Sequence, residues 1–313
     1  MPLSELDLSP WAVRAAALVW GLIWGSFINV VIYRVPRAMS VVRPGSHCPA
    51  CGAPIRPLDN IPLLSWVLLR SRASCCGAKI SSRYAVVELL AGAVAVAVAE
   101  LVFRQSGNLS AVHGMALFLA DFGLAMALVA AAFIDAEHMY LPDAITIGGT
   151  LFGLATPGLR DLSWGEAIAG AAAGFGGVWI LFVVGYRALR GRAGMGLGDA
   201  KLLMLAGGWF GWQGAVFALF AGAVQATLAA AVVFIVRGKI EEPAAVRADR
   251  EALVMAAAEG DAEAQKALLE DPLATAPQDG LLAARIPFGP FLCVAIIEWM
   301  LAGEWIRDTF PWL

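Results

Sequence analysis

Long uninterrupted runs of apolar residues dominate this chain, in place of the one-sided apolar stripes that surface helices of soluble proteins show. A helix needs about 20 mostly apolar residues to cross the hydrocarbon core of a bilayer. The pattern therefore predicts membrane-spanning helices, together with one short apolar stretch at 202–212. The predicted spans lie near 11–33, 84–103, 114–134, 144–159, 167–186, 215–236 and 286–306.

The composition agrees with this pattern. Hydrophobic residues make up 60% of the 313 residues and charged residues 15%, against roughly 45–50% and 25% in soluble domains. So few charges do not cover the surface of a soluble fold of this length. The composition thus excludes a soluble enzyme, and the apolar runs exclude a disordered chain.

The basic residues predict the orientation of the helices. Of the 22 lysines and arginines, 18 fall within 34–83, 187–201 and 237–285, and the positive-inside rule places these segments in the cytoplasm. Residues 202–236 must then cross outward and return, as two short helices that turn within 211–214. The sequence therefore predicts an all-α, polytopic membrane protein with eight transmembrane helices and both termini outside.

The first predicted region, 1–33, is a transmembrane helix. It is not expected to be a cleaved signal peptide, because its leading segment carries Glu5 and Asp7 in place of a basic n-region. The second region, 34–83, is rich in Arg, Pro and Cys and too long for a turn. We expect it to form a cytoplasmic, cysteine-containing loop domain.

The third predicted region, 84–313, holds the remaining membrane helices and an acidic cytoplasmic insert, 238–284. The insert has ten acidic and four basic residues. The stretch 246–270 predicts one or two solvated helices with a break near Gly260. A charged, solvated loop is the simplest interpretation of the insert, and docking of a partner is the alternative.

Two carboxylates near span ends carry the strongest chemical signal, because ionisable groups at membrane depth are costly and commonly functional. Asp135 ends one span, and Asp199 follows the glycine-rich segment Gly196-Leu-Gly198 at a helix start. On two helices at one depth, the carboxylates can converge on one water and share one proton. One then acts as a base while its protonated partner polarises a carbonyl. An N-cap role for Asp199 and an interfacial charge at Asp135 are the alternatives.

The other carboxylates have simpler interpretations. Asp143, the nearest competitor of Asp135, sits where helix-capping aspartates are common. Asp121 and Glu298 are expected to face the bundle and to hydrogen-bond across it. Glu88 lies near a predicted cytoplasmic end, where it could pair with Arg83.

The cysteines give a second signal. Cys48 and Cys51 form a CxxC motif, and the adjacent Cys75 and Cys76 follow in the same predicted loop. Cytoplasmic thiols stay reduced, and four thiolates suit a tetrahedral structural Zn²⁺. Adjacent ligands strain the usual CxxC hairpin, so free thiols or a redox pair remain alternatives. Cys293, within a span, is expected to be inert core.

Two further patterns point to packing and to the membrane. Gly170 and Gly174 predict close helix packing and not a nucleotide-binding loop, because no strand precedes them. The basic charge of 34–83 surrounds a membrane interface, so its expected partner is the lipid bilayer and not nucleic acid.

The order and spacing of several motifs along nearly the whole chain resemble the type IV prepilin peptidases, also called prepilin leader peptidases/N-methyltransferases. The motifs are Gly25-Ser-Phe-Ile-Asn-Val-Val-Ile-Tyr-Arg34-Val-Pro, Cys48/Cys51, Asn60-Ile-Pro-Leu-Leu-Ser-Trp66, Ile80-Ser-Ser-Arg83-Tyr84 with Glu88, Phe133-Ile-Asp135 with Leu141-Pro-Asp143, Gly196-Leu-Gly-Asp199-Ala-Lys201, and Pro287-Phe-Gly-Pro290.

The resemblance implies a bacterial inner-membrane aspartic peptidase whose catalytic residues are Asp135 and Asp199. Such enzymes cut the basic leader from prepilins or pseudopilins after a glycine, on the cytoplasmic side. Many then methylate the new N-terminus with S-adenosylmethionine, an activity assigned to the cytoplasmic loop. The family's second CxxC would begin at Ala73; Cys76 matches its second cysteine, and Cys75 is the available substitute.

Two rival functions follow from the same residues. A related two-aspartate intramembrane protease would act on other targets, but simpler relatives lack a domain like 34–83. A proton-coupled transporter would use membrane carboxylates as relays. Transporters commonly show paired repeats and mid-bilayer sites, whereas Asp135 and Asp199 are predicted at the interface. The sequence names neither the pilin substrate nor the oligomeric state.

Overall fold

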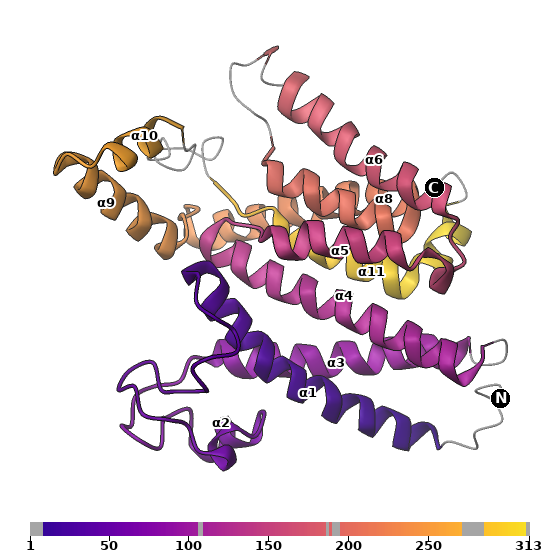
Figure 1. Cartoon of the computed structure of the whole chain (residues 1–313), viewed down its shortest axis with the longest axis horizontal. Helices are drawn as coiled ribbons and strands as arrows, with labels where there is room; N and C mark the ends of the chain where they lie inside the picture. The colour runs from indigo at the N-terminus through magenta and orange to yellow at the C-terminus, as the bar shows by residue number, and fades with distance from the viewer. Residues whose placement is uncertain (1–8, 106–108, 186–187, 190–194, 271–284, 311–313) are drawn as a thin grey trace.

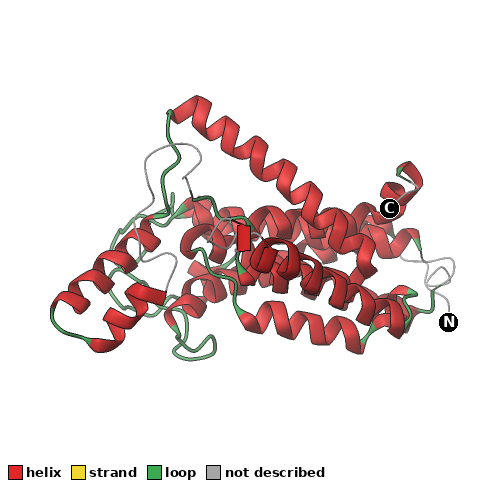
Figure 2. Cartoon of the chain, turned by 90° about the horizontal axis from the view of Figure 1, so that it is seen from above, coloured by secondary structure: helices red, strands yellow, loops and turns green. Residues whose placement is uncertain are grey.

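The computed structural model describes residues 9–105, 109–185, 188–189, 195–270 and 285–310. The leading segment with Glu5 and Asp7, and the later part of the acidic insert, lie outside these residues. The described residues form helices and loops without a β-strand, and two isolated β-bridges are the only strand-like pairings among them (Figure 2). The long helices are α1 (Pro10–Arg34), α3 (Ser82–Arg104), α4 (Ala111–His138), α5 (Asp143–Ala155), α6 (Trp164–Val178), α8 (Leu197–Arg237) and α11 (Gly289–Thr309).

Shorter elements connect the long helices. The segment between α1 and α3 contains the 3-10 helices η2 (Val35–Arg37) and η3 (Pro57–Asn60) and the short helix α2 (Leu64–Leu68). The 3-10 helix η4 (Pro157–Arg160) follows α5, and the π-helix η5 (Trp179–Gly185) continues α6. The acidic insert contributes α9 (Ala244–Ala258) and α10 (Ala262–Glu270).

Six helices among the described residues are long and apolar enough to cross a membrane, and they come from α1, α3, α4, α6, α8 and α11. The chain is therefore a multi-pass membrane protein. Helix α5 is also apolar, but it has 13 residues and spans about 20 Å, less than the hydrocarbon core. It ends sooner than the predicted span 144–159 because Pro157 opens a 3-10 turn.

Helix α8 bends where the sequence predicts a turn. Gly211 has φ 73° and ψ −178°, a conformation that interrupts the helix and that glycine adopts without steric cost. Asp199 and Leu203 before the bend line the same cavity as Leu219 and Ala223 after it, so the two halves fold back on each other. The stretches 202–212 and 215–236 are thus two arms of one bent helix. Eight complete crossings remain a prediction.

Small residues bring the helices close together. A Cβ atom on Gly170 of α6 would collide with the carbonyl oxygen of Gly207, and one on Gly174 with that of Leu203. The predicted close packing at Gly170 and Gly174 is therefore confirmed. In the α1–α3 pair, a Cβ on Gly25 would lie 2.7 Å from the Cα of Glu88. Such close backbone approach is how membrane helices gain packing energy without a hydrophobic driving force.

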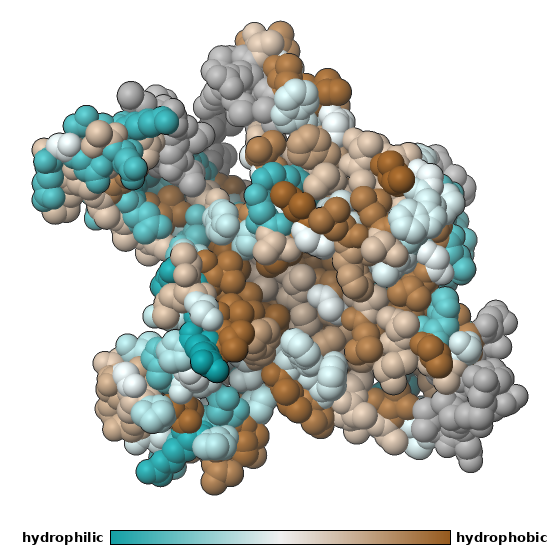
Figure 3. Space-filling view, viewed as in Figure 1, coloured by the Kyte–Doolittle hydropathy of each residue, from teal (hydrophilic) through white to brown (hydrophobic). Residues whose placement is uncertain are grey.

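The polar segments gather at one end of the bundle (Figures 1 and 3). The segment between α1 and α3 and the α9–α10 pair lie at the left of Figure 1, whereas α1 begins and α11 ends at the right. Apolar surface covers much of the face between them (Figure 3). The helices of the insert break between Ala258 and Ala262, so the break predicted near Gly260 is confirmed and two helices form where one or two were predicted.

Candidate active site

Asp135 lies in the last turn of α4, as predicted from its place at the end of an apolar run. Met139 ends the helix in the left-handed conformation, and its N–H donates to the carbonyl oxygen of Asp135. The side chain is buried, and its Oδ2 accepts a hydrogen bond of 3.0 Å from the N–H of Gly289, the first residue of α11. A Cβ on Gly289 would lie only 2.7 Å from that oxygen. Only glycine therefore allows this approach.

Asp199 lies in the first turn of α8. The N-cap position belongs to Gly196, so the alternative in which Asp199 is an ordinary N-cap is wrong. The carboxylate faces back toward the helix start, where a Cβ on Gly196 would lie 3.3 Å from Oδ2. Asp199 is half-buried at a cavity of about 760 Å³, whose walls are largely apolar and come from α6, both arms of α8 and the segment before α11.

The structure brings the two aspartates together. The carboxylates of Asp135 and Asp199 are close enough to interact electrostatically with each other. Both also interact electrostatically with the buried thiol of Cys293. Asp199 also shares its cavity with Phe288, the residue before the glycine that binds Asp135. The ends of α4, α8 and α11 thus meet at one point, and the two carboxylates predicted to pair lie there.

Two contacts hold the α4–α5 link against the start of α8. Gly198 allows close packing, since a Cβ there would lie 3.3 Å from the Cβ of Leu141. Lys201 Nζ forms an ion pair of 2.7 Å with Asp143 Oδ1. Asp143 is thus engaged with a lysine, and its side chain is 59% exposed. The contact gives Asp143 a structural role in holding two helix ends together.

Glu88, near the start of α3, has a different partner from the one considered from the sequence. Glu88 does not pair with Arg83: its Oε2 accepts a hydrogen bond of 2.8 Å from the N–H of Leu63, whereas Arg83 pairs with Glu137 at 2.6 Å. This contradicts the pairing considered from the sequence. The reason is that Glu137 extends from the end of α4 toward the start of α3, so it reaches Arg83 from a neighbouring helix.

Asp121 and Glu298 differ in burial and in hydrogen bonding. Asp121 is buried as expected, near the charge of Arg160, but its Oδ1 has no hydrogen-bond partner among the described residues. Glu298 bonds across the bundle as expected, accepting from Gln225 Nε2 at 2.7 Å. It lies at an exposed position and not inside the bundle. Among the described residues, neither Asp121 nor Glu298 forms a hydrogen bond with Asp135 or Asp199.

The four loop cysteines converge on one point. Their Sγ atoms all lie within 4.8 Å of one another. The first pair lies in a hairpin closed by bonds from Cys48 N–H to Ala53 and from Gly52 N–H to Cys48. The second hairpin repeats the same two bonds at Ala73, Gly77 and Ala78, and both glycines have positive φ. Ala73 therefore occupies the structural place of Cys48, and Cys75 supplies the thiol that Ala73 lacks.

The sulfur positions fit a tetrahedral metal. Zinc–sulfur bonds of ~2.3 Å place tetrahedral sulfur ligands ~3.8 Å apart. The Sγ atoms of Cys48 and Cys76 lie 3.7 Å apart and those of Cys51 and Cys75 lie 3.4 Å apart. The adjacent cysteines thus reach one centre despite the expected strain. In addition, the backbone N–H groups of Ala50 and Cys51 lower the pKa of Cys48 to about 7, whereas a hydrogen bond with Cys51 raises the pKa of Cys75 to about 12, so the thiolate form that binds metals is favoured at Cys48.

Comparisons with known proteins show the family to which the chain is related. Residues 19–102 match the Bacterial Peptidase A24 N-terminal domain, and residues 122–234 match the Type IV leader peptidase family. The chain is 33% identical to a prepilin leader peptidase/N-methyltransferase of Myxococcus xanthus, over 94% of this chain and 91% of that protein. The chain belongs to the prepilin leader peptidase/N-methyltransferase family. Its likeness to the Neisseria gonorrhoeae member is 36% over 76% of this chain and 88% of that protein.

The member from Aeromonas hydrophila is 38% identical, over 65% of this chain and 75% of that protein. No solved structure matches the chain. The first family match covers most of α1, the cysteine segment and most of α3, and the second runs from the middle of α4 to near the end of α8 and includes both aspartates. The acidic insert after residue 238 lies beyond both matches. The two chemically distinct clusters of this prepilin peptidase family member therefore fall in different matched regions.

Sequence reasoning missed the contacts that orient the aspartates. Gly289 appeared only as part of a motif, although it donates directly to Asp135. Lys201 appeared in the same way, although it binds Asp143. A glycine at the start of an apolar run, flanked by prolines, is the available signal for Gly289, but only the folded chain shows which carboxylate it meets.

Proposed function

We propose that this chain is a membrane aspartic endopeptidase that removes the leader of type IV prepilins or type II secretion pseudopilins after a glycine, and then methylates the new N-terminus. The observation that carries the proposal is the meeting of Asp135 and Asp199 at the ends of α4 and α8, beside an apolar cavity. The family membership supports the same activity.

The two carboxylates divide the proton transfers between them. The ionised aspartate takes a proton from water as the water oxygen attacks the carbonyl carbon of the glycine that precedes the cut. The protonated partner polarises that carbonyl and later gives its proton to the departing amine. Asp199 lies in the first turn of α8, and Asp135, at the end of α4, accepts a hydrogen bond from Gly289 at the start of α11. The backbone N–H groups at these two helix starts favour negative charge at the pair.

The cavity beside Asp199 gives the substrate its direction. Its walls, from α6 and both arms of α8, are largely apolar, so they suit a hydrophobic residue on the retained side of the cut. The basic leader then extends toward the polar end of the bundle. Glycine before the cut lets the peptide backbone approach the carboxylates closely, because no Cβ intervenes.

Methylation belongs to the cysteine segment in this proposal. S-adenosylmethionine supplies the methyl group for the new amine. Zinc held by Cys48, Cys51, Cys75 and Cys76 would stabilise the fold of 34–83, a segment that builds only a small apolar core of its own. We divide the chain into 1–33, the first membrane helix; 34–83, the cysteine domain; and 84–313, the peptidase domain with its acidic insert.

The proposed setting is the bacterial inner membrane, with eight crossings and the aspartates on the cytoplasmic side. Reporter fusions near 60, 190 and 260 should all report cytoplasm, because the basic residues concentrate there. Fusions near 108, 162 and the C-terminus should report the outside. A fusion at 260 that reports the outside would show that α8 crosses only once and would remove the eight-crossing topology.

A cleavage assay without a membrane gradient separates the peptidase from its rivals. The detergent-solubilised chain should release the leader from a prepilin, whereas a proton-coupled transporter would release nothing. A prepilin whose glycine before the cut is replaced by a bulky residue should be cut far more slowly. Failure to cut any prepilin contradicts the proposed function, and equal cutting of both substrates favours a two-aspartate protease with other targets.

A further inference from the structure

Asp121 is a buried carboxylate that takes no part in the proton transfers proposed above. It lies within α4, the helix that ends beside Asp135, and is 4% exposed. Ionisable groups inside a membrane bundle are costly, so they commonly have a function and an opposite charge nearby. The opposite charge here is Arg160 of η4, a 3-10 turn that packs against α4. A carboxylate on α4 is thus coupled to a guanidinium carried by a different element.

Arg160 connects α4 to the first arm of α8 and to α5. Its Nε donates to the carbonyl oxygen of Trp209 at 3.1 Å, and its Nη2 to that of Gly153 at 3.0 Å. The guanidinium carbon also lies 4.1 Å from the centre of the Trp209 ring, a cation–π contact. Trp209 is itself 2% exposed and donates to the carbonyl oxygen of Gly149 at 2.8 Å. Trp209 comes just before the bend at Gly211, where the helical hydrogen bonds are interrupted, so Arg160 supplies a donor at that point.

One polar atom on each side of the Asp121–Arg160 pair has no hydrogen-bond partner within the part of the chain that the structure describes. These atoms are Asp121 Oδ1 and Arg160 Nη1, and both are buried. Buried polar groups are rarely left unpaired. A water molecule that accepts from Nη1 and donates to Oδ1 would satisfy both atoms, and buried waters commonly join such groups.

We propose that Asp121 and Arg160, joined through one internal water, are positioning residues that fix the register of α4 against the first arm of α8. The proposal rests on the proposed peptidase function, because Asp135 and Asp199 lie on these two helices. Asp121 is about 21 Å along α4 from Asp135, and Trp209 is about 15 Å along α8 from Asp199. A helix that slides along its axis carries its far end with it, so a contact at one end sets the alignment at the other.

The packing of α4 explains why such a contact is needed. Helix α4 packs on α1, α3 and α11, with smaller contacts to α5 and η4, and does not pack extensively on α8. Its register against α8 is therefore set through intermediate elements. Apolar side chains resist sliding only weakly, because lipid tails are as apolar as the side chains themselves. Two opposite charges at membrane depth resist it more strongly, and a misplacement of about 1 Å can lower a catalysed rate about 100-fold.

A distance measurement tests the register without any substrate. Full-length protein in detergent carries spin labels at Ala136 and Leu197, two exposed positions at the end of α4 and the start of α8. The labels are introduced as unnatural amino acids, so the native cysteines stay unlabelled. In Asp121→Asn the distance between the labels should shift by about 1.5 Å, the rise of one helical residue, or its distribution should broaden. Glu100→Gln is the matched control, because it removes an ion pair that joins α1 to α3, and it should leave the distance unchanged.

A double variant separates register from stability. Removal of one partner leaves the other charge buried and can unfold the chain, whereas removal of both is much less costly. The melting temperature of Asp121→Asn/Arg160→Gln should therefore lie closer to that of wild type than those of the single variants. The distance between the labels should still be altered, because no charge pair then opposes sliding.

Prepilin cleavage by the double variant gives a second readout. We expect kcat to fall about 5- to 20-fold and KM to change less than about 2-fold, because α4 does not line the cavity beside Asp199. The pH range of cleavage should also narrow, because carboxylates that lie farther apart share a proton less strongly. A loss of stability alone would not change this range. The other charged or titratable groups around the aspartates are unaltered in the variant: Cys293, the pair Lys201–Asp143 and the pair Arg83–Glu137.

A wild-type label distance in both Asp121→Asn and the double variant would overturn the proposal. A double variant with unchanged kcat and pH range, or with a raised KM alone, would also overturn it. If the wild-type protein cuts no prepilin, the proposed function fails, whereas the register is still decided by the distance between the labels.

Discussion

The aspartate pair and the cysteine cluster are assembled by different physical means. Asp135 and Asp199 are carried by long helices whose close packing fixes where their ends meet, and Gly289 adds a direct backbone contact. The cysteines are carried by two short hairpins and brief helical turns, with Cys48 as the only buried apolar residue between α1 and α3. Packing therefore preorganises the first cluster, whereas we expect the second to depend on a bound metal ion to hold its shape.

The comparison of the two clusters predicts that substitution of either aspartate causes the largest loss of prepilin cleavage. Asp135→Asn or Asp199→Asn should leave the helices inserted but lower prepilin cleavage by about 10³-fold or more, because an amide supplies neither the base nor the shared proton. The measurement is the initial rate of leader release in membranes. Glu298→Gln is the matched control, since Glu298 lies at an exposed site on α11. Near wild-type cleavage by either aspartate variant would exclude the two-aspartate mechanism.

A smaller effect is expected at the glycine that touches the pair. Gly289→Ala would place a Cβ 2.7 Å from Asp135 Oδ2, so either α11 or the carboxylate must move. A displacement of this kind should lower kcat/KM for prepilin about 10- to 100-fold. Gly123→Ala in α4 is the control, because a Cβ there meets nothing within 4 Å. Equal activity of the two variants would mean that Asp135 is not held by Gly289.

The sequence predicted most of the helices, the turn in α8 and the proximity of the two aspartates, because each depends on a local pattern: apolar length, glycine at a bend, and charge at a span end. The catalytic role of the aspartates stays a prediction. The sequence also predicted the convergence of four cysteines on one loop. It did not predict that Arg83 binds Glu137, or that Gly289 binds Asp135, since these partners lie 54 and 154 residues apart. Such pairings depend on which helix ends meet, and that is decided by packing between helices.

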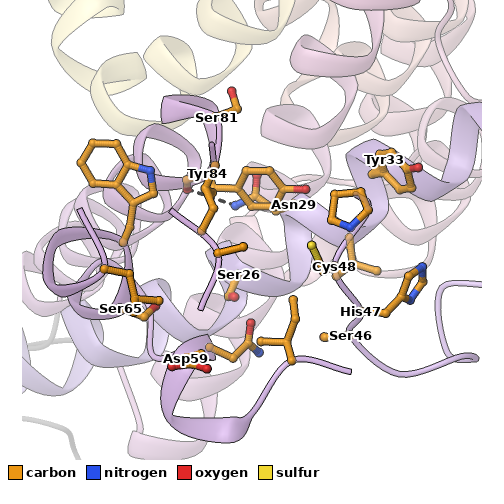
Figure 4. Close-up of a pocket in the computed structure, with 18 of the residues that line it drawn as sticks. Ser26, Asn29, Tyr33, Ser46, His47, Cys48, Asp59, Ser65, Ser81 and Tyr84 are labelled. Carbon is orange, nitrogen blue, oxygen red and sulfur yellow. Dashed lines mark hydrogen bonds between the residues drawn. The ribbon is translucent and has the colours of Figure 1, made fainter. Parts of the chain in front are cut away.

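The shortening of α5 has a local origin. Apolar residues continue to Leu159, so hydropathy extends the predicted span, but the helix itself ends at Ala155 because Pro157 opens a 3-10 turn. Conversely, the cavity between α1, α3 and the cysteine segment left no pattern in the sequence (Figure 4). Asn29 and Trp66 are 37 positions apart and belong to a membrane helix and a loop helix, and only their common cavity relates them.

The smallest loss of cleavage is expected when the ion pair between Lys201 and Asp143 is removed. Lys201→Met should lower cleavage about 2- to 5-fold, because Asp143 is largely exposed and exposed pairs contribute little. Asp143→Asn should act similarly, and the double variant should lose no more than either single variant. Fully multiplicative losses, measured by initial rates at low salt, would show that the two residues act independently.

Mass spectrometry of the processed pilin N-terminus tests the separation of the two sites most directly. In Cys48→Ser with Cys51→Ser, the cysteine segment should lose its zinc, measured by metal analysis of the purified chain, and methylation should be weakened or lost. Cleavage should fall much less, because the contacts of Asp135 and Asp199 come from other helices. The account predicts pilin that is cut but unmethylated. Equal loss of cutting and methylation, or normal methylation by metal-free wild-type protein, would contradict it.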